Sequence, residues 1–144
     1  TVLEFLVASG EVLLVTTPEP TSITDSYSLL KSLNSHQRFN PEETKVKMIA
    51  NKVMSEEDGN ILYCKLNAVV ERYLKTKMEY LGSVPFDNQL AEAVMQQSPV
   101  VIKAPNARSA QAYERIANKL LGNEEVARNG RGMAAFFQHI LGGK

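Results

Sequence analysis

Hydrophobic residues along this chain fall into short runs separated by longer stretches with helical spacing. Val12–Val15 is an uninterrupted apolar run, which is typical of a parallel strand covered on both faces. Mixed runs at 46–53 and 80–85 predict a second and a third strand, and Val100–Lys103 predicts an edge strand or an extended lead into a proline. Helical spacing predicts helices over residues 2–6, from about residue 22, and over 60–75, 89–97 and 110–121. The alternation predicts an α/β fold, with part of a mostly parallel sheet flanked by helices.

The turn after the first strand leads directly into a helix. Pro18 and Pro20 cannot extend a central strand, and either Ser22 or Thr24 can cap the helix that follows. We expect Asp25 in the first helical turn, where the positive end of the helix dipole favours a carboxylate. This turn lies at the carboxyl end of a parallel strand, the edge where open α/β sheets place ligands. An ordinary strand-to-helix connection explains the same residues without a ligand.

Composition narrows the possible functions. The 144 residues are 44% hydrophobic, which suits one domain, and 16 basic residues balance 16 acidic ones. With no net charge to attract nucleic acid, we expect no nucleic-acid partner. The single cysteine, Cys64, excludes an internal disulfide framework and is interpreted as a reduced, packed thiol. No signal peptide or long apolar stretch is evident in these residues, so the expected location is the cytoplasm.

The last residues carry an amphipathic pattern of their own. Five apolar residues share one helical face at spacing i, i+3, i+4, i+7, i+8: Met133, Phe136, Phe137, Ile140 and Leu141. A helix this short is marginal in water and needs a surface on which to bury that face. A membrane interface is one such surface, with Arg128, Arg131 and Lys144 available for anionic lipid. Docking on the chain's own domain is the other.

Three segments carry a family resemblance: TTPEPTSITDSYSLLK at 16–31, KMIANKV at 47–53, and YLGSVPFDNQLAEAVMQQSPVV at 80–101. Together they resemble the C-terminal half of the MinD/ParA-type (deviant Walker, SIMIBI-class) P-loop ATPases. The greatest likeness is to the FlhG branch, also called YlxH or FleN, which regulates flagellar number. The resemblance implies that residues 1–121 are the C-terminal half of such an ATPase domain, and that residues 122–144 are a linker and a membrane-targeting tail.

In that family a glycine-rich loop with lysine holds the ATP phosphates, and an Asp-containing switch segment positions Mg²⁺ and water. Neither motif occurs in these 144 residues. His36 and His139 fall in a loop and in the tail, and no serine is paired with a base by motif. We therefore expect a fragment that has no catalytic residues or metal site and that binds no ATP, ADP or Mg²⁺ by itself.

The resemblance also implies roles for individual residues. Asn51 would contact the adenine edge, and the loop Pro85, Phe86 and Asp87 would wrap the adenine and ribose. Asp25 would lie near the face used for ATP-dependent dimerisation and partner binding. Purely local roles remain open: Asn51 can bond to its own loop, the segment 85–87 can be a simple turn, and Asp25 can serve the helix dipole.

For the intact protein, the resemblance implies an ATP switch at the cytoplasmic face of the bacterial membrane. ATP favours a homodimer, the dimer places its tails on the membrane, and hydrolysis reverses both steps. The implied partners are an FlhF-type SRP GTPase and flagellar C-ring proteins. Two alternatives stay open. One is a branch of the same superfamily that positions division sites or chromosomes. The other is an interaction module without nucleotide, although its exposed strand edge would favour aggregation.

Overall fold

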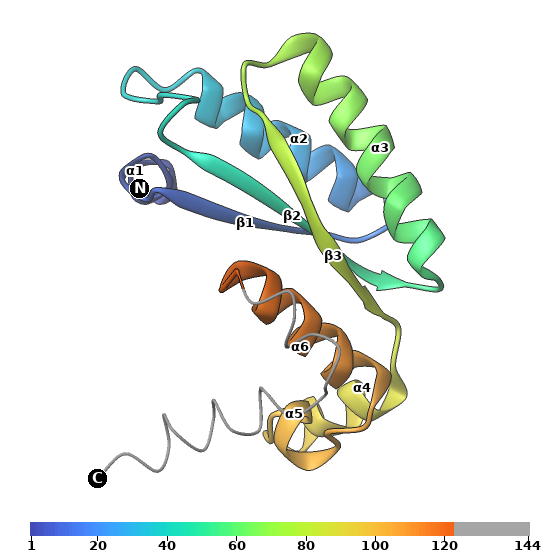
Figure 1. The fold of residues 1–144 in the computed structure, drawn as a ribbon. Coiled ribbons are helices and arrows are strands. Elements are labelled where there is room, and N and C mark those ends of the chain that lie inside the picture. Colours follow the sequence, from blue (N-terminus) through green and yellow to red (C-terminus); the bar gives the residue numbers. More distant parts are fainter. Residues whose placement is uncertain (123–144) are drawn as a thin grey trace, which may run out of the picture.

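A computed structural model describes residues 1–122 of the chain as a parallel sheet with helices on both sides. Strands β1 (Glu11–Thr16), β2 (Lys45–Val53) and β3 (Met78–Pro85) pair in parallel in the order β1-β2-β3. Helices α2 (Pro20–Asn34) and α3 (Glu56–Tyr73) lie on one face of the sheet, and α6 (Arg108–Leu120) lies on the other (Figure 1). The predicted α/β class and the three predicted strands are confirmed.

The main hydrophobic core lies between the sheet and helices α2 and α3. Alternate residues of β1 and β2 point into it, which is the two-residue period of a strand with one packed face. Its buried members come from all five of these elements: Val12, Leu14, Leu30, Val46, Met48, Ala50, Val53, Leu62, Leu66, Val70 and Met78. The loop between α2 and β2 occupies residues 35–44, close to the predicted surface connection.

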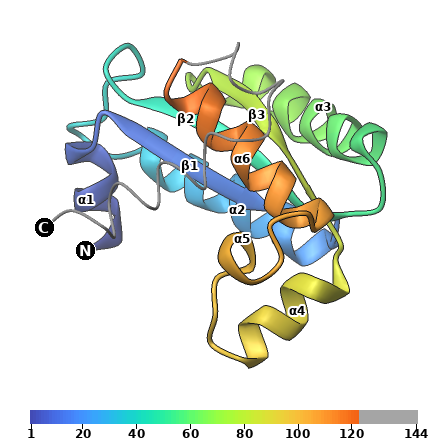
Figure 2. The ribbon, with the colours of Figure 1, turned by 60° about the horizontal axis from the view of Figure 1, so that its bottom comes forward.

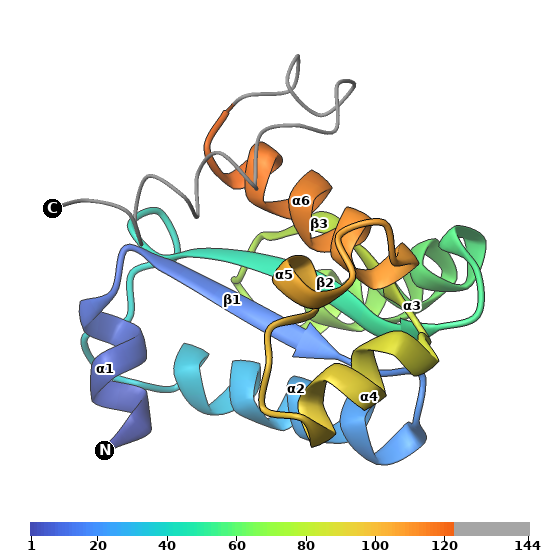
Figure 3. The same cartoon turned by 90° about the horizontal axis from the view of Figure 1, so that it is seen from below.

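The opposite face of β1 is open among the described residues. Leu13 and Val15 point to this face and remain 47% and 54% exposed. The expectation that β1 is covered on both faces is therefore wrong for residues 1–122. Helix α6 packs instead over β3, through a small cluster of Leu81, Val84, Ala112 and Ile116. In Figure 3, α2 lies alongside β1, and α6 lies over β3 and not over β1.

Helix α2 begins earlier than its polar residues suggested. Glu19 is its N-cap and Pro20 occupies the first position, where a missing N–H costs nothing. Neither Ser22 nor Thr24 caps the helix. The Ser22 hydroxyl accepts a hydrogen bond from the Thr17 N–H at 3.0 Å, which fixes the turn after β1. Asp25 lies beyond the first turn, which contains no acidic residue, so its predicted position at the dipole is wrong.

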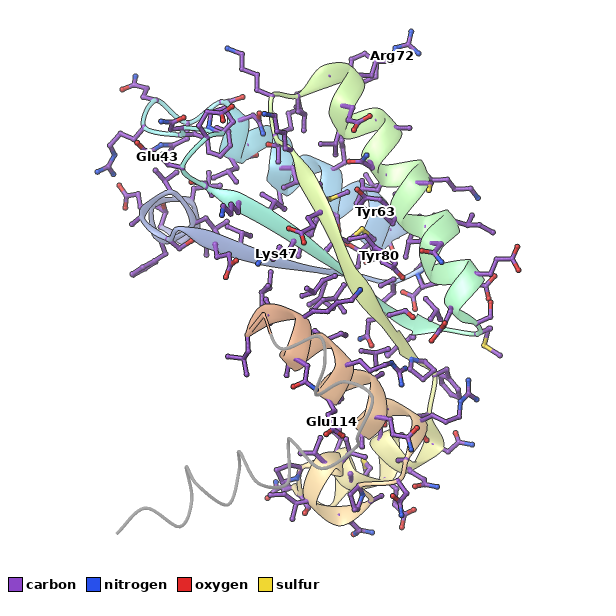
Figure 4. The ribbon with its side chains drawn as sticks, viewed as in Figure 1. Glu43, Lys47, Tyr63, Arg72, Tyr80 and Glu114 are labelled. Carbon is purple, nitrogen blue, oxygen red and sulfur yellow. The ribbon has the colours of Figure 1, made fainter. Side chains whose placement is uncertain are left out.

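Helix α3 also begins earlier than predicted, because Ser55 caps it. The Ser55 hydroxyl accepts the Asp58 N–H at 3.1 Å. At Gly59 the helix approaches β3 so closely that an added Cβ would lie 2.6 Å from the Tyr80 hydroxyl. The Tyr80 ring stacks on Tyr63 of α3 at 5.0 Å between centroids (Figure 4). Cys64 is exposed, so its interpretation as a packed thiol is wrong.

The remaining helices are α1 (Val2–Ala8), α4 (Asn88–Met95) and α5 (Val100–Lys103). The run Val100–Lys103 forms one helical turn and not a strand. Its amides bond back along the chain, from Lys103 to the Pro99 carbonyl at 3.0 Å and from Ala104 to the Val100 carbonyl at 2.8 Å. Val100 is buried in a cluster with Ala93, Ala107 and Ala110, which joins α4, α5 and α6. Within residues 1–122, the length and hydropathy of the helices identify no membrane-spanning segment.

Candidate functional site

The carboxyl ends of β2 and β3 meet and bring together four of the predicted binding residues. Asn51 lies opposite Val84, and Val53 lies opposite Pro85. The Phe86 N–H then donates to the Val53 carbonyl at 2.9 Å, which ties the loop after β3 to the end of β2. The loop continues into α4, beyond the carboxyl edge of the sheet (Figure 2). The structure therefore places Asn51 and the segment Pro85–Asp87 at one edge.

Asn51 presents an unsatisfied acceptor at this edge. Its Oδ1 is buried and has no hydrogen-bond partner among the described residues. The register shifts between Asn51 and Val53, where Lys52 takes a left-handed conformation with φ 54°. A buried amide oxygen without a partner costs free energy, so a donor brought by a ligand would be favoured there. The exocyclic amino group of adenine is such a donor, and the Asn51 amide suits it chemically.

Pro85 and Phe86 contribute apolar surface at the same edge of the sheet as Asn51. Phe86, which directly follows β3, is 53% exposed. An exposed aromatic ring at a ligand-binding edge can stack on a flat heterocycle. The combination of a free amide oxygen and an exposed aromatic ring suits a nucleobase.

Asp87 holds this loop in place with hydrogen bonds from two helices. Its Oδ1 caps α4 by accepting the Gln89 N–H at 2.9 Å, and its Oδ2 accepts the Ser109 N–H at 2.9 Å and the Ser109 hydroxyl at 2.8 Å. The Ser109 backbone N–H, the Ser109 hydroxyl and the Gln89 N–H together lower the pKa of the Asp87 carboxyl. Asp87 is therefore a positioning residue that fixes the loop against α4 and α6.

No pattern in the sequence indicated that Ser109 pairs with Asp87. It is buried at the start of α6, 22 residues after Asp87, and no spacing rule links a loop carboxylate to a serine at that distance. Only the packing of α6 against the end of β3 brings the two side chains together.

Asp25 lies at a different place on the carboxyl edge. It is exposed on α2 and lines a hollow of about 460 Å³ beside the end of β1, with Thr17 and Ser22. The Thr17 Oγ1 is buried and has no hydrogen-bond partner among residues 1–122. Asp25 therefore lies on α2 beside the end of β1, whereas Asn51 lies in the neighbouring strand β2.

The remaining sequence predictions concern a metal site and the membrane-contacting tail. Within residues 1–122, no group of three His, Cys, Asp or Glu side chains is arranged to hold a metal ion. The domain boundary near residue 121 remains a prediction. The predicted membrane-contacting residues lie outside the described part of the chain: Met133, Phe136, Phe137, Ile140 and Leu141.

No family model matches the chain. The chain is 35% identical over 140 residues to the antiactivator FleN of Pseudomonas aeruginosa, with 97% of this chain and 48% of FleN covered. It is 30% identical over 143 residues to the flagellum site-determining protein YlxH of Helicobacter pylori, with 95% and 46% covered. The MinD cell division protein of Aquifex aeolicus superposes with a TM-score of 0.62 at 21% identity, over 81% of this chain and 46% of that one. The chain spans about half the length of these relatives.

Proposed function

We propose that this chain forms the adenine and ribose side of an ATP-dependent switch. The chain belongs to the MinD/ParA family of P-loop ATPases and matches part of its FlhG-like members. The switch regulates the number and placement of flagella. FleN is named as an antiactivator and YlxH as a flagellum site-determining protein, and each aligns with nearly all of this chain. That similarity favours the flagellar branch over division-site or chromosome positioning.

The observations that carry the proposal are the unpartnered Asn51 Oδ1 and the exposed Phe86 ring, which belong to the carboxyl ends of two neighbouring strands. In the proposed complex, Asn51 accepts a hydrogen bond from the adenine amino group, and Pro85 and Phe86 cover the base. Asp87 keeps the loop in position through Gln89 and Ser109. The phosphates and Mg²⁺ are held by a P-loop segment outside these 144 residues, so the chain alone has no catalytic role.

The switch itself follows from differential binding. ATP, when bound, supplies binding energy that differs between monomer and homodimer and so favours the dimer. We place the dimer and partner surface near Asp25, which is exposed beside the hollow at the end of β1. The open apolar face of β1, with Leu13 and Val15, gives the rest of the ATPase domain a surface on which to pack.

The tail supplies the second half of the switch. Its five apolar residues on one face would bind weakly to the cytoplasmic membrane from one monomer and more strongly from a dimer, because two linked tails raise the effective concentration. An FlhF-type SRP GTPase and flagellar C-ring proteins are the proposed protein partners, by family resemblance. The working location is the cytoplasm with reversible attachment to the membrane.

A comparison of two proteins tests the proposed function. ATP binding by calorimetry and phosphate release are measured on the 144-residue chain and on the same chain preceded by the P-loop half of the domain. We expect binding and hydrolysis only in the longer protein, because the phosphate contacts supply most of the nucleotide affinity. Tight ATP binding by the 144-residue chain would contradict the assignment of the phosphate site to another segment.

A further inference from the structure

The outer edge of β3 borders a trough between two helices. Among residues 1–122, β3 pairs only with β2, so its other edge has no strand neighbour. Two hollows of about 220 and 210 Å³ lie along this edge and share Glu56, Ser83 and Arg115. They form one continuous β3-edge trough, lined by Glu56, Asn60, Ser83, Arg108, Arg115 and Lys119. Helix α3 forms one wall and α6 the other (Figure 1).

The edge itself is suited to pairing with another strand. An edge strand presents unpaired backbone N–H and C=O groups, and proteins usually block such edges with proline or charged side chains. The segment Tyr80–Val84 contains neither, and its one irregularity is a shift in register with β2 at Leu81. Five residues of edge, from Tyr80 to Val84, span about 16 Å, which is enough for an extended peptide of similar length.

The charge of the trough selects an anionic peptide. Arg108, Arg115 and Lys119 are exposed along α6 and line the trough. Glu56 is the acidic residue among the lining residues, and it pairs with Arg115 at 3.8 Å between Oε1 and Nη2. Both side chains are largely exposed, at 82% and 48%, so this pair is weak and readily exchanged for another carboxylate. The lining therefore carries three cations against one carboxylate.

We propose that the β3-edge trough binds an extended acidic segment of a partner protein, which adds to β3 as a further strand. Backbone hydrogen bonds to the edge supply affinity, and the α6 cations supply selectivity for alternating carboxylates. A nucleic acid or an anionic lipid headgroup matches the charge but cannot pair with a strand edge, so the backbone pairing distinguishes the peptide. At one end the trough reaches Pro85, where it borders the proposed nucleotide site, but Asn51, Phe86 and Asp87 do not line it. The proposal does not depend on nucleotide.

The test uses the full 144-residue chain and a fluorescein-labelled peptide that alternates glutamate and valine over six residues, with binding followed by fluorescence anisotropy. Two further peptides carry N-methyl groups on one or the other alternate set of backbone amides. Only one set faces the protein in strand addition. We expect one N-methylated peptide to lose binding at least about tenfold and the other to bind nearly as well as the parent. Equal behaviour of the two would overturn the proposal.

Charge reversal at Arg115 and Lys119 tests the trough wall. Arg115→Glu with Lys119→Glu is expected to weaken the acidic peptide at least about tenfold, while Lys31→Glu with Lys65→Glu, the same charge change at exposed positions on α2 and α3, leaves it unchanged. The proposal is overturned if both double variants weaken binding equally, or if the peptide fails to bind at about 1 mM. It is also overturned if anionic vesicles or a single-stranded oligonucleotide bind this wall and the peptide does not.

Discussion

Glutamate at both Phe136 and Ile140 is expected to abolish binding of the protein to anionic vesicles. Each of these side chains, when buried at an interface, contributes about 1.5–3 kcal/mol. Losing both, and adding two negative charges beside anionic lipid, removes roughly 3–6 kcal/mol, or a factor of about 10² to 10⁴ in affinity. Vesicle co-sedimentation, with and without the P-loop half and ATP, measures the loss.

The control places the same charges away from the apolar stripe. Gln138→Glu with His139→Glu adds two carboxylates within the same segment but leaves all five apolar residues in place. We expect this variant to retain most of its vesicle binding, with increased sensitivity to salt. If Phe136→Glu with Ile140→Glu binds vesicles as well as the unchanged protein, the tail has no part in membrane attachment.

Asp87→Ala is expected to lower the free energy of unfolding by about 2–4 kcal/mol. The substitution removes the N-cap of α4 and leaves the buried Ser109 without its acceptor. Urea unfolding at neutral pH measures the change. Asp58→Ala is the matched control, since Asp58 is an exposed carboxylate in the first turn of α3. It should cost less than about 1 kcal/mol.

The contribution of Asp87 depends on pH in a defined direction. Hydrogen bonds from Ser109 and Gln89 lower the pKa of its carboxyl in the folded state. The stabilisation is therefore fully present above the ordinary carboxyl pKa of about 3.9 and is lost as the pH falls through the lower, folded-state pKa. The difference in unfolding free energy between Asp87→Ala and the unchanged chain should shrink below about pH 4. A difference that persists undiminished well below that pH would contradict the hydrogen-bonding account.

The sequence was informative where a local pattern determines local structure. Apolar runs located β1, β2 and β3, and the order of strands and helices was enough to predict parallel pairing. Asn51 and Pro85–Asp87 could be placed at one edge because they lie at or just after the ends of two predicted strands, and carboxyl ends of parallel strands lie together. The role of these residues in nucleotide binding remains a prediction.

Other features of the fold depend on tertiary packing, or on sequence patterns too short to be recognised. The four residues of α5 are too few to show a helical period, and only the burial of Val100 against α4 and α6 explains the turn. The early start of α3 had a readable signal, a serine three residues before Asp58, but the apolar pattern begins later. The exposed face of β1 and the Asp87–Ser109 pair depend on which elements are neighbours in space, and no local spacing encodes that.

The central claim, that Asn51 recognises the base of a bound nucleotide, is tested most directly by calorimetry with ATP and GTP. The protein is the P-loop-containing form, measured unchanged and with Asn51→Ala. Asn88→Ala, an exposed amide in the first turn of α4, serves as the control. We predict that Asn51→Ala weakens ATP binding about tenfold or more and reduces the preference for ATP over GTP. The Asn88→Ala control should change neither. An unchanged ATP affinity in folded Asn51→Ala would contradict the account.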